Sequence, residues 1–309
     1  MKVQDIPCRT ILNPTGGFLG EGFTHSINLY RGCALGNTLC GVYCYAQWNS
    51  FHLQGRPWGS FLDVKHGVIE AYRAQYDRLK HPKFGEAKPI HIFMSSVTEP
   101  YPPQERSTRR TRQLLEEMLI RPPDSLVIQT HTPLVIDDLP VLERLHPKCH
   151  LQINITVETD LPALPQPFPP HAYSPRSRIN VLHTFREVGL QTVATVSPLL
   201  PLHDPWQFAS DLETSSHRVI LDHYLLGDES VDGKRTKHTA LPQLLGAAGF
   251  QEWNTLEKFQ EIVGIFKEAF GDGSRVGISQ EGFNAASRTF QNDGECKMEH
   301  HQVKGHIIK

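Results

Sequence analysis

The sequence predicts an α/β protein whose central sheet is parallel. Short β-rich apolar runs recur along the chain, and helical patterns separate most of them. Alternating strands and helices favour a parallel sheet with right-handed crossovers. The residues that follow the strands are nearly all polar, which predicts one shared site at the carboxyl ends of the strands. Such units suit an open doubly wound sheet as well as a partial barrel, and periodicity alone does not choose between them.

Six apolar runs predict the strands. Each is rich in β-branched or aromatic residues, and most end at polar residues, as strands in a sheet do. They cover residues 26–32, 91–96, 126–131, 151–156, 191–198 and 218–224.

Five helices are predicted between and after these strands. The strongest pattern, 255–271, has a threonine near its start and a glycine at its end, which are typical helix boundaries. The proline-rich segment 161–170 cannot form a helix and is interpreted as a rigid surface loop. The other helical patterns cover residues 68–79, 108–120, 138–145 and 175–189.

We expect one main domain, because the chain has no internal repeat and no long low-complexity linker. This domain is predicted to span residues 26–271. An N-terminal extension, 1–25, would precede it, and a C-terminal segment, 272–309, would follow it. The last part of that segment, 296–309, is predicted to be an irregular tail.

The composition gives no sign of a strongly charged partner. The 31 basic and 33 acidic residues leave a net charge of −2, so nucleic acid binding would require a local basic patch. No apolar run reaches the roughly 18 residues that a membrane helix needs, and the first residues lack the apolar core of a signal peptide. We therefore expect a cytoplasmic protein without a membrane partner, in a compartment where thiols stay reduced.

Three of the six cysteines lie in one short segment, 28–47, with the sequence NLYRGCALGNTLCGVYCYAQ. Their spacing is Cys33-x6-Cys40-x3-Cys44, directly after the first predicted strand. In a reducing compartment, clustered cysteines indicate metal ligands or reactive thiols rather than disulfides. Three thiolates on one loop suit a cubane iron–sulfur cluster, which leaves one iron open for an exogenous ligand.

Two other interpretations of the cysteines stay open. A structural zinc site needs four ligands, usually in paired motifs. The fourth would be His52, His25 or Cys8, and no second cysteine pair is present. The three cysteines could also be buried without a metal, although their glycine and asparagine neighbours are not typical of a core.

The flanking residues, YRGC before and YCYA after, resemble the cluster loop of radical S-adenosylmethionine enzymes. More narrowly, they resemble the branch related to spore photoproduct lyase. The resemblance implies a partial (β/α)6 TIM-type barrel and a 4Fe–4S cluster held by Cys33, Cys40 and Cys44. It implies that S-adenosylmethionine binds the open iron and is reductively cleaved to a 5′-deoxyadenosyl radical. It also implies a protein reductant of the flavodoxin or ferredoxin type. Such chemistry belongs to the cofactor, and the protein positions it.

Further segments resemble the same branch, in the same order, over roughly residues 26–224. The ordered series is more specific than any one fragment. The segments are residues 94–105, 111–112, 128–142, 153–160 and 175–204.

The resemblance also implies which residues bind S-adenosylmethionine. Tyr43 holds the position of a bulky residue against the adenine. Ser95 and Ser96 end the second predicted strand and Glu99 follows it, where the superfamily binds the amino group, and Glu99 would accept from that ammonium. The candidates for the ribose and carboxylate are Thr130, His131, Asn154, Thr156, Glu158 and Arg178.

The chain departs from the branch at three points. Its cysteine spacing is longer than the usual Cys-x3-Cys-x2-Cys. His131 stands where the branch has a lysine, so the charge there would depend on pH. Ser96 stands where spore photoproduct lyase has a hydrogen-donating cysteine, and a serine O–H bond is too strong for that role. We therefore do not carry over thymine-dimer repair.

Other polar residues have plainer interpretations. The four arginines of residues 105–112 are expected to lie on a solvated helix face rather than to bind phosphate. Cys149 is expected to be structural, and Cys296 is a candidate hydrogen donor. Candidate substrate contacts at later strand ends are His203, Asp204, Asp222 and His223.

The sequence thus predicts a radical S-adenosylmethionine enzyme that abstracts hydrogen from a substrate still to be identified, with no catalytic side chain assigned. Two alternatives stay open. One is radical chemistry on a nucleic acid lesion, which the charge balance does not favour. The other is a non-catalytic, zinc-binding interaction protein that uses the same cysteines.

Overall fold

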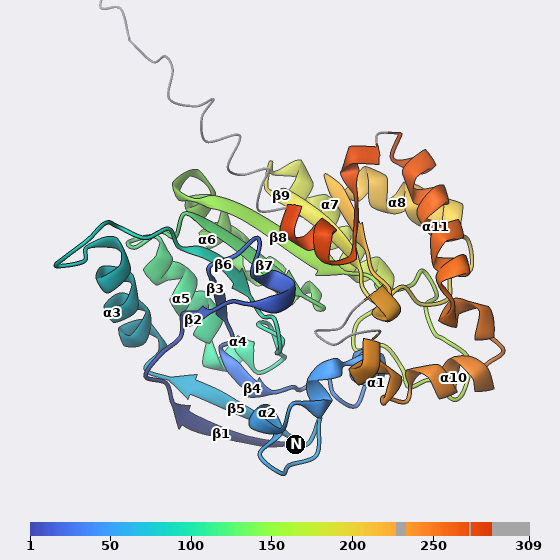
Figure 1. Cartoon of the computed structure of the whole chain (residues 1–309), viewed down its shortest axis with the longest axis horizontal. Coiled ribbons are helices and arrows are strands. Elements are labelled where there is room, and N and C mark those ends of the chain that lie inside the picture. Colours follow the sequence, from blue (N-terminus) through green and yellow to red (C-terminus); the bar gives the residue numbers. More distant parts are fainter. Residues whose placement is uncertain (227–232, 272, 286–309) are drawn as a thin grey trace, which may run out of the picture.

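The computed structural model of the chain describes residues 1–226, 233–271 and 273–285 (Figure 1). Within these residues the main sheet has eight strands, and all neighbouring strands run parallel except the last pair. The two outer strands do not pair with each other, so the barrel stays open and partial. The strand order is β11 (Val276–Ile278), β10 (Arg218–Leu221), β9 (Gln191–Val196), β8 (His150–Thr156), β7 (Ser125–Thr130), β6 (His91–Met94), β3 (His25–Ile27) and β2 (Asn13–Pro14).

Five of the six predicted strands are confirmed as β6 to β10, each within a few residues of the predicted bounds. The prediction of one continuous strand over 26–32 is wrong. Strand β3 ends at Ile27, and the chain then leaves the main sheet to form β4 (Tyr30–Gly32) in a second sheet. The physical reason is Asn28, whose Oδ1 accepts from the backbone N–H groups of Val97 and Thr98 in place of a strand partner.

The second sheet has, in the described part of the chain, three strands in the order β1-β5-β4, and it contains the start of the cysteine segment. β5 (Phe61–His66), which the sequence analysis missed, pairs in parallel with β1 (Lys2–Pro7) and antiparallel with β4. Its centre is Asp63, a fully buried carboxylate that accepts from the side chains of Arg31 and Arg56. The predicted N-terminal extension therefore supplies an edge strand to the sheet that holds β4.

Helices lie at all five predicted positions, and one further helix joins β9 to β10. The predicted helix over 108–120 is interrupted at Arg109, which has a φ of +51°. A buried carboxylate, Glu105, accepts from the backbone N–H groups of Arg110, Thr111 and Arg112 and so begins the second half. The helices are α3 (Val68–Lys80), α4 (Glu105–Thr108), α5 (Arg110–Met118), α6 (Leu139–Leu145), α7 (Pro175–Glu187), α8 (Pro205–Ser215) and α11 (Leu256–Ala269).

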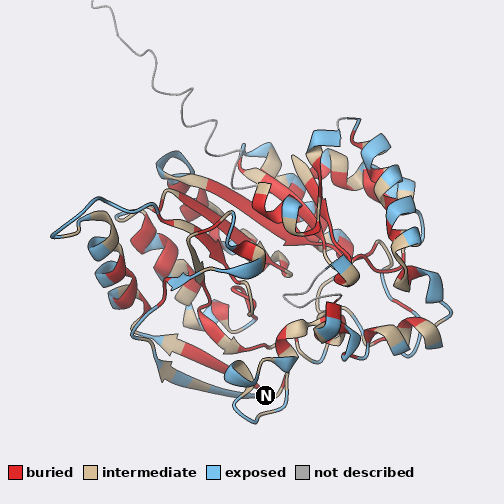
Figure 2. Cartoon of the chain, viewed as in Figure 1, coloured by how far each residue is buried: buried red, intermediate tan, exposed pale blue. Residues whose placement is uncertain are grey.

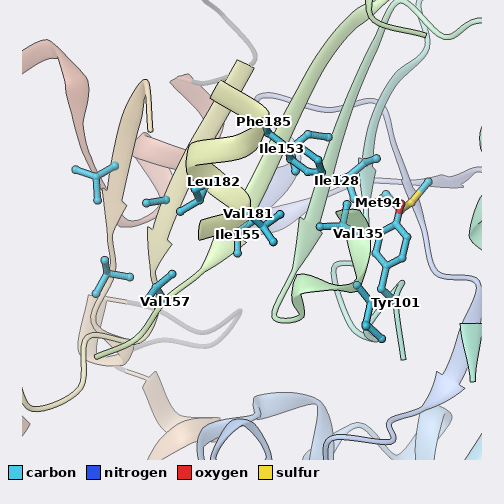
Figure 3. Packing of buried hydrophobic residues seen from close by; sticks show 14 of the residues in the cluster. Met94, Tyr101, Ile128, Val135, Ile153, Ile155, Val157, Val181, Leu182 and Phe185 are labelled. Atoms are coloured by element: carbon cyan, nitrogen blue, oxygen red, sulfur yellow. The ribbon is translucent and has the colours of Figure 1, made fainter. Parts of the chain in front are cut away.

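The main sheet separates two apolar clusters because side chains alternate between its faces. Ile128, Ile153 and Ile155 pack toward the α7 residues Leu182 and Phe185 in the large core (Figure 3). The buried residues of Figure 2 follow this sheet and the helix faces that contact it. The alternate positions on the other face form a smaller cluster of Phe93, Val127, Val193 and Ile220 with Leu19, Phe23 and Phe283.

The described part of the predicted C-terminal segment contains β11, which pairs in parallel with β10. The division of the chain into extension, main domain and C-terminal segment stays a prediction. The predicted tail, 296–309, lies outside the described residues. None of the helices in the described residues is long and apolar enough to span a membrane.

Candidate functional site

The cysteine segment folds into a compact turn after Cys33 and then a short helix, α1 (Leu39–Tyr43), which contains Cys40. Two close glycine contacts make this turn. A Cβ on Gly41 would lie 1.9 Å from the carbonyl oxygen of Gly36, and one on Gly36 would lie 2.5 Å from the Cα of Gly59. Side chains at Gly36 and Gly41 would therefore clash with backbone. The longer spacing seen in the sequence is thus accommodated by a packed turn.

Two hydrogen bonds hold the cysteine segment against the main sheet. Leu39 N donates to the carbonyl oxygen of Pro170 at 2.9 Å, so α1 rests on the proline-rich loop after β8. Tyr45, directly after Cys44, donates its hydroxyl to the carbonyl oxygen of Ser96 at 2.5 Å, after β6. The cysteines are therefore held at the carboxyl ends of the strands.

All three cysteines line one cavity of about 200 Å³ at this end of the sheet. The opposite walls come from the strand ends, as the polar strand endings predicted. Of the residues predicted to bind S-adenosylmethionine, six line this cavity: Tyr43, Ser95, Ser96, Glu99, His131 and Thr156.

The three thiols are close enough to influence one another. Burial and, after it, the nearby Cys44 raise the pKa of Cys33 to about 12. Burial also raises the pKa of Cys40, with added contributions from Cys44 and Cys33. For Cys44, burial outweighs the opposing backbone N–H groups of Ala46 and Gln47 and raises the pKa to about 11. Cys33 is buried, and Cys40 and Cys44 are partly buried. Three such converging thiols fit a bound cationic group, because burial and mutual repulsion disfavour their thiolate forms unless a cation offsets them.

No group of three or more His, Cys, Asp or Glu residues within the described ranges is arranged to hold a metal ion. A cubane cluster makes a different demand on its ligands, because each thiolate binds a separate iron. The five cysteines of the described ranges are all free of disulfide bonds.

A buried carboxylate, Glu158, joins the cysteine helix to the sheet. It accepts from the Tyr43 hydroxyl, from His131 Nδ1 at 3.3 Å and from Arg178 Nη1 at 2.6 Å. Burial alone would raise the pKa of Glu158, but Arg178, His131 and Tyr43 together hold it well below its usual range. Arg178 also donates to the carbonyl oxygen of Thr156 at the end of β8. Glu158 and Arg178 line a small neighbouring pocket beside Cys40 rather than the main cavity.

The predicted acceptor Glu99 is also fully buried, and it ties the loop after β6 to the end of β7. Its Oε1 accepts from Tyr101 N and from the Thr130 hydroxyl, and its Oε2 accepts from His131 N at 2.9 Å. Burial raises the pKa of Glu99, and these bonds oppose the shift. Thr130 is therefore a partner of Glu99 and does not line the cavity.

Ser95 differs from its neighbours because its hydroxyl is buried, lines the cavity and has no hydrogen-bond partner among the described residues. Its φ of +75° is a conformation that residues other than glycine rarely adopt. Strained residues of this kind concentrate at functional sites. By contrast, Ser96 accepts from Asn28 Nδ2 at 3.1 Å.

The floor of the cavity is a ladder of side-chain amides and hydroxyls across β7, β8 and β9. Gln129 Nε2 donates to Thr156 Oγ1 at 2.7 Å and to Thr195 Oγ1 at 2.9 Å. Asn154 donates to Gln129 Oε1 at 3.2 Å but does not line the cavity. Sequence reasoning missed Gln129, although it lies on a predicted strand two residues before His131.

The four candidate substrate contacts at the later strand ends differ in their position relative to the cavity. Asp222 lines the cavity and accepts from the Ser197 hydroxyl at 2.9 Å. Asp204 caps α8 by accepting from Gln207 N, and the backbone N–H of His203 donates to Asp160. His223 is buried and stacks on Tyr224. Of these candidate substrate contacts, only Asp222 lines the cavity.

An apolar wall completes the cavity and could not be predicted from strand ends. It consists of Phe18, Leu19, Phe93 and Phe283. The Phe283 ring lies 5.7 Å from Phe18 and 6.4 Å from Phe93, between ring centroids. Phe93 faces the cavity because side chains alternate along its strand. Phe18 and Phe283 lie in segments for which the sequence analysis predicted no helix or strand.

The arginine-rich segment, Cys8 and Cys149 do not line the cavity. Arg112 pairs with Asp138, and Arg106 pairs with Asp137. Cys149 is partly buried against the carbonyl oxygen of Leu145, and burial raises its pKa to about 12. Cys296 lies outside the described residues.

No family model matches the chain. Two curated proteins are similar to it. Uncharacterized protein MJ0683 of Methanocaldococcus jannaschii is 26% identical over 201 residues, covering 65% of this chain and 69% of that protein. Uncharacterized protein ORF301 of Acidianus two-tailed virus is 29% identical over 180 residues, covering 58% of this chain and 54% of that protein. The chain thus spans about half the length of the second relative.

Among solved structures, the chain is similar to spore photoproduct lyase complexed with dinucleoside spore photoproduct. The TM-score is 0.57 at 12% identity, covering 90% of this chain and 81% of the lyase. A variant of that lyase gives a TM-score of 0.54 at the same coverage. The predicted partial TIM-type barrel is therefore confirmed as a fold. The fold is similar to that of spore photoproduct lyase.

Proposed function

We propose that this protein is a radical S-adenosylmethionine enzyme. Cys33, Cys40 and Cys44 would hold a 4Fe–4S cluster, and S-adenosylmethionine would lie between that cluster and the strand ends. When bound, these two groups supply a 5′-deoxyadenosyl radical that abstracts hydrogen from a substrate. The observation that carries this proposal is the convergence of three cysteine thiols and six of the predicted S-adenosylmethionine residues on one cavity.

The chain's own residues would orient the cofactor and exclude water. Ser95 presents an unpartnered hydroxyl for a polar group of the ligand. Glu99 is held by three hydrogen bonds, and one remaining lone pair on its two oxygens could accept from the ligand's ammonium. Tyr43 packs 6.5 Å from His131, between ring centroids, and the two rings would confine the adenosine.

Glu158 and Arg178 would act as positioning residues. They do not line the main cavity, but Glu158 binds both Tyr43 and His131, which do. The pair therefore fixes the cysteine helix relative to the end of β7. His131 would take the position of the family's lysine, and its ring Nδ1 is directed toward the Glu158 carboxylate.

Lesion repair on a nucleic acid has less support from the cavity. Its lining, as far as the structure describes it, includes Glu99 and Asp222 but no lysine or arginine. A phosphodiester group inside the cavity would therefore meet two carboxylates and no lysine or arginine to bind it. The zinc-binding alternative stays open until the metal is measured.

The experiment is anaerobic cluster reconstitution, followed by S-adenosylmethionine and dithionite, with 5′-deoxyadenosine measured by chromatography. The wild-type protein is expected to form it. Cys40→Ala is expected to abolish the product, whereas the matched control Cys149→Ala, outside the cavity, is expected to retain it. Product formation unaffected by Cys40→Ala would rule out the proposal.

A further inference from the structure

We propose that an acidic one-electron carrier protein docks on a basic and aromatic surface beside the three cysteines. This α2–α9 surface consists of Trp48, Phe51, Lys234, Lys237 and His238. The inference rests on the proposed function, since reductive cleavage of S-adenosylmethionine consumes an electron. In that step the carrier loses one electron, and one C–S bond of S-adenosylmethionine breaks to give methionine and the 5′-deoxyadenosyl radical. Electrons and charge therefore balance with the carrier as the only co-reactant.

Two segments far apart in the sequence form this surface. Trp48 ends the short 3-10 helix η2 (Tyr45–Trp48), and Phe51 lies in α2 (Ser50–Leu53). His238 directly follows α9 (Lys234–Lys237), and its ring lies 6.0 Å from the Trp48 ring, between centroids. η2 and α9 pack together. In Figure 1 the orange segment before α10 (Leu241–Ala247) lies beside α1.

The surface is exposed and has the composition of a protein interface. Phe51 is 75% exposed and Trp48 is 53% exposed, so two large apolar side chains face solvent within four residues. Lys234, Lys237 and His238 are exposed beside them. Exposed aromatic side chains framed by charged ones are typical of protein-binding sites.

The charge of this surface differs in sign from that of the chain. The chain has 33 acidic residues and a net charge of −2, yet residues 33–62 and 233–251 contain no Asp or Glu. The acidic residues of segment 227–232 precede α9 in the sequence and lie outside the described residues. A local basic patch attracts an acidic partner and speeds its association.

The same segments border the cavity that contains the cysteines. Cys44 directly precedes η2, and Thr236 of α9 lines the cavity together with Cys33 and Cys40. A carrier on the α2–α9 surface would therefore contact two segments, η2 and α9, that also line the cavity. Electron transfer slows steeply with distance, so docking at segments that line the cavity would favour reduction.

The test uses reduced flavodoxin as the probe and dithionite as a carrier-independent reductant. The double variant Lys234→Glu/Lys237→Glu is compared with Lys267→Glu, an exposed lysine on α11. Charge reversal is expected to weaken flavodoxin binding, measured by biolayer interferometry, by about tenfold or more and to flatten its salt dependence. The flavodoxin-driven rate of 5′-deoxyadenosine formation should fall in parallel, while the dithionite-driven rate stays unchanged. Phe51→Ser should weaken binding without altering its salt dependence.

Flavodoxin affinity equal in the wild type and the double variant would overturn the inference. So would duplex DNA binding that the double variant loses while flavodoxin binding is retained, because the surface would then serve a nucleic acid. Failure of the proposed function has a different signature: no 5′-deoxyadenosine would form even with dithionite. The binding measurement would still decide whether the α2–α9 surface docks the carrier.

Discussion

Glu158 and Arg178 form a fully buried ion pair, with Oε2 and Nη1 2.6 Å apart, beneath the helix that contains Cys40. Glu158 has two further donors, the Tyr43 hydroxyl and His131 Nδ1, so one carboxylate joins three elements at the candidate site. A buried charge is tolerated only when it is paired and hydrogen-bonded. The pair is therefore a sensitive point for both stability and cofactor binding.

Removing one member of this pair should be more damaging than removing both. Arg178→Met leaves Glu158 buried without its cation, and we expect a loss of about 3–5 kcal/mol in the free energy of unfolding. The double variant Glu158→Gln/Arg178→Met should lose less, because no charge stays unpaired. Urea unfolding measures both.

The matched control for Arg178 is Arg176 on the same helix. Its side chain is 72% exposed and its nearest carboxylate, Asp211, lies 3.6 Å away. Arg176→Met should therefore change the free energy of unfolding by less than about 0.5 kcal/mol. Equal losses for Arg176→Met and Arg178→Met would contradict the assigned role.

Replacing Ser95 with glycine should stabilise the fold and weaken the binding of S-adenosylmethionine. Ser95→Gly relieves the positive φ and removes a buried hydroxyl without a partner, so the free energy of unfolding should rise by about 1 kcal/mol. Affinity for S-adenosylmethionine, measured by equilibrium dialysis on the reconstituted protein, should fall. Ser95→Ala should lower affinity similarly without relieving the backbone. Unchanged affinity in both variants would remove Ser95 from the site.

Gly41 should be required for the cysteine turn. An alanine Cβ there would lie 1.9 Å from the carbonyl oxygen of Gly36, so Gly41→Ala must displace α1 and its cysteine. We expect a several-fold loss of iron bound after reconstitution, measured by colorimetric assay. The control is Gly246→Ala in α10, where a Cβ would meet nothing within 4 Å. That variant should keep its iron, and similar losses in both would refute the geometric explanation.

Stability should depend on pH through Asp63. Burial alone would raise the pKa of Asp63, but hydrogen bonds from Arg56 and Arg31 outweigh it and lower the pKa below its usual value. A group with a lowered folded pKa stabilises fully above its unfolded pKa, about 3.9, and loses this contribution as pH falls toward the folded value. The stability difference between wild type and Asp63→Asn should therefore be largest near neutral pH. It should shrink below about pH 4 in urea titrations; a difference independent of pH would contradict this assignment.

Much of the fold follows from local patterns in the sequence. Strands β6 to β10 and helix α11 are confirmed. They could be predicted because their apolar residues follow the period of the element, and because Thr255 caps α11. The break after Ile27 could not be predicted, since it depends on Asn28 binding the backbone of Val97 and Thr98, about 70 residues away. Tertiary contacts of this kind override a strand pattern.

The candidate site was likewise predictable in part and dependent on tertiary contacts in part. Strand-end position correctly suggested that Ser95, Glu99 and His131 would gather near the cysteines. Strand-end position could not distinguish residues that line the cavity from residues that only support them, such as Arg178. Both kinds are polar residues near the ends of strands in the sequence. The apolar wall escaped prediction because Phe283 belongs to a segment outside the predicted barrel.

The most direct test of the account is the iron and acid-labile sulfide content of the anaerobically reconstituted protein. The account predicts about four of each per chain and a loss of both in the Cys33→Ala/Cys40→Ala/Cys44→Ala variant. One zinc per chain without sulfide, or iron retained without the three cysteines, would contradict it.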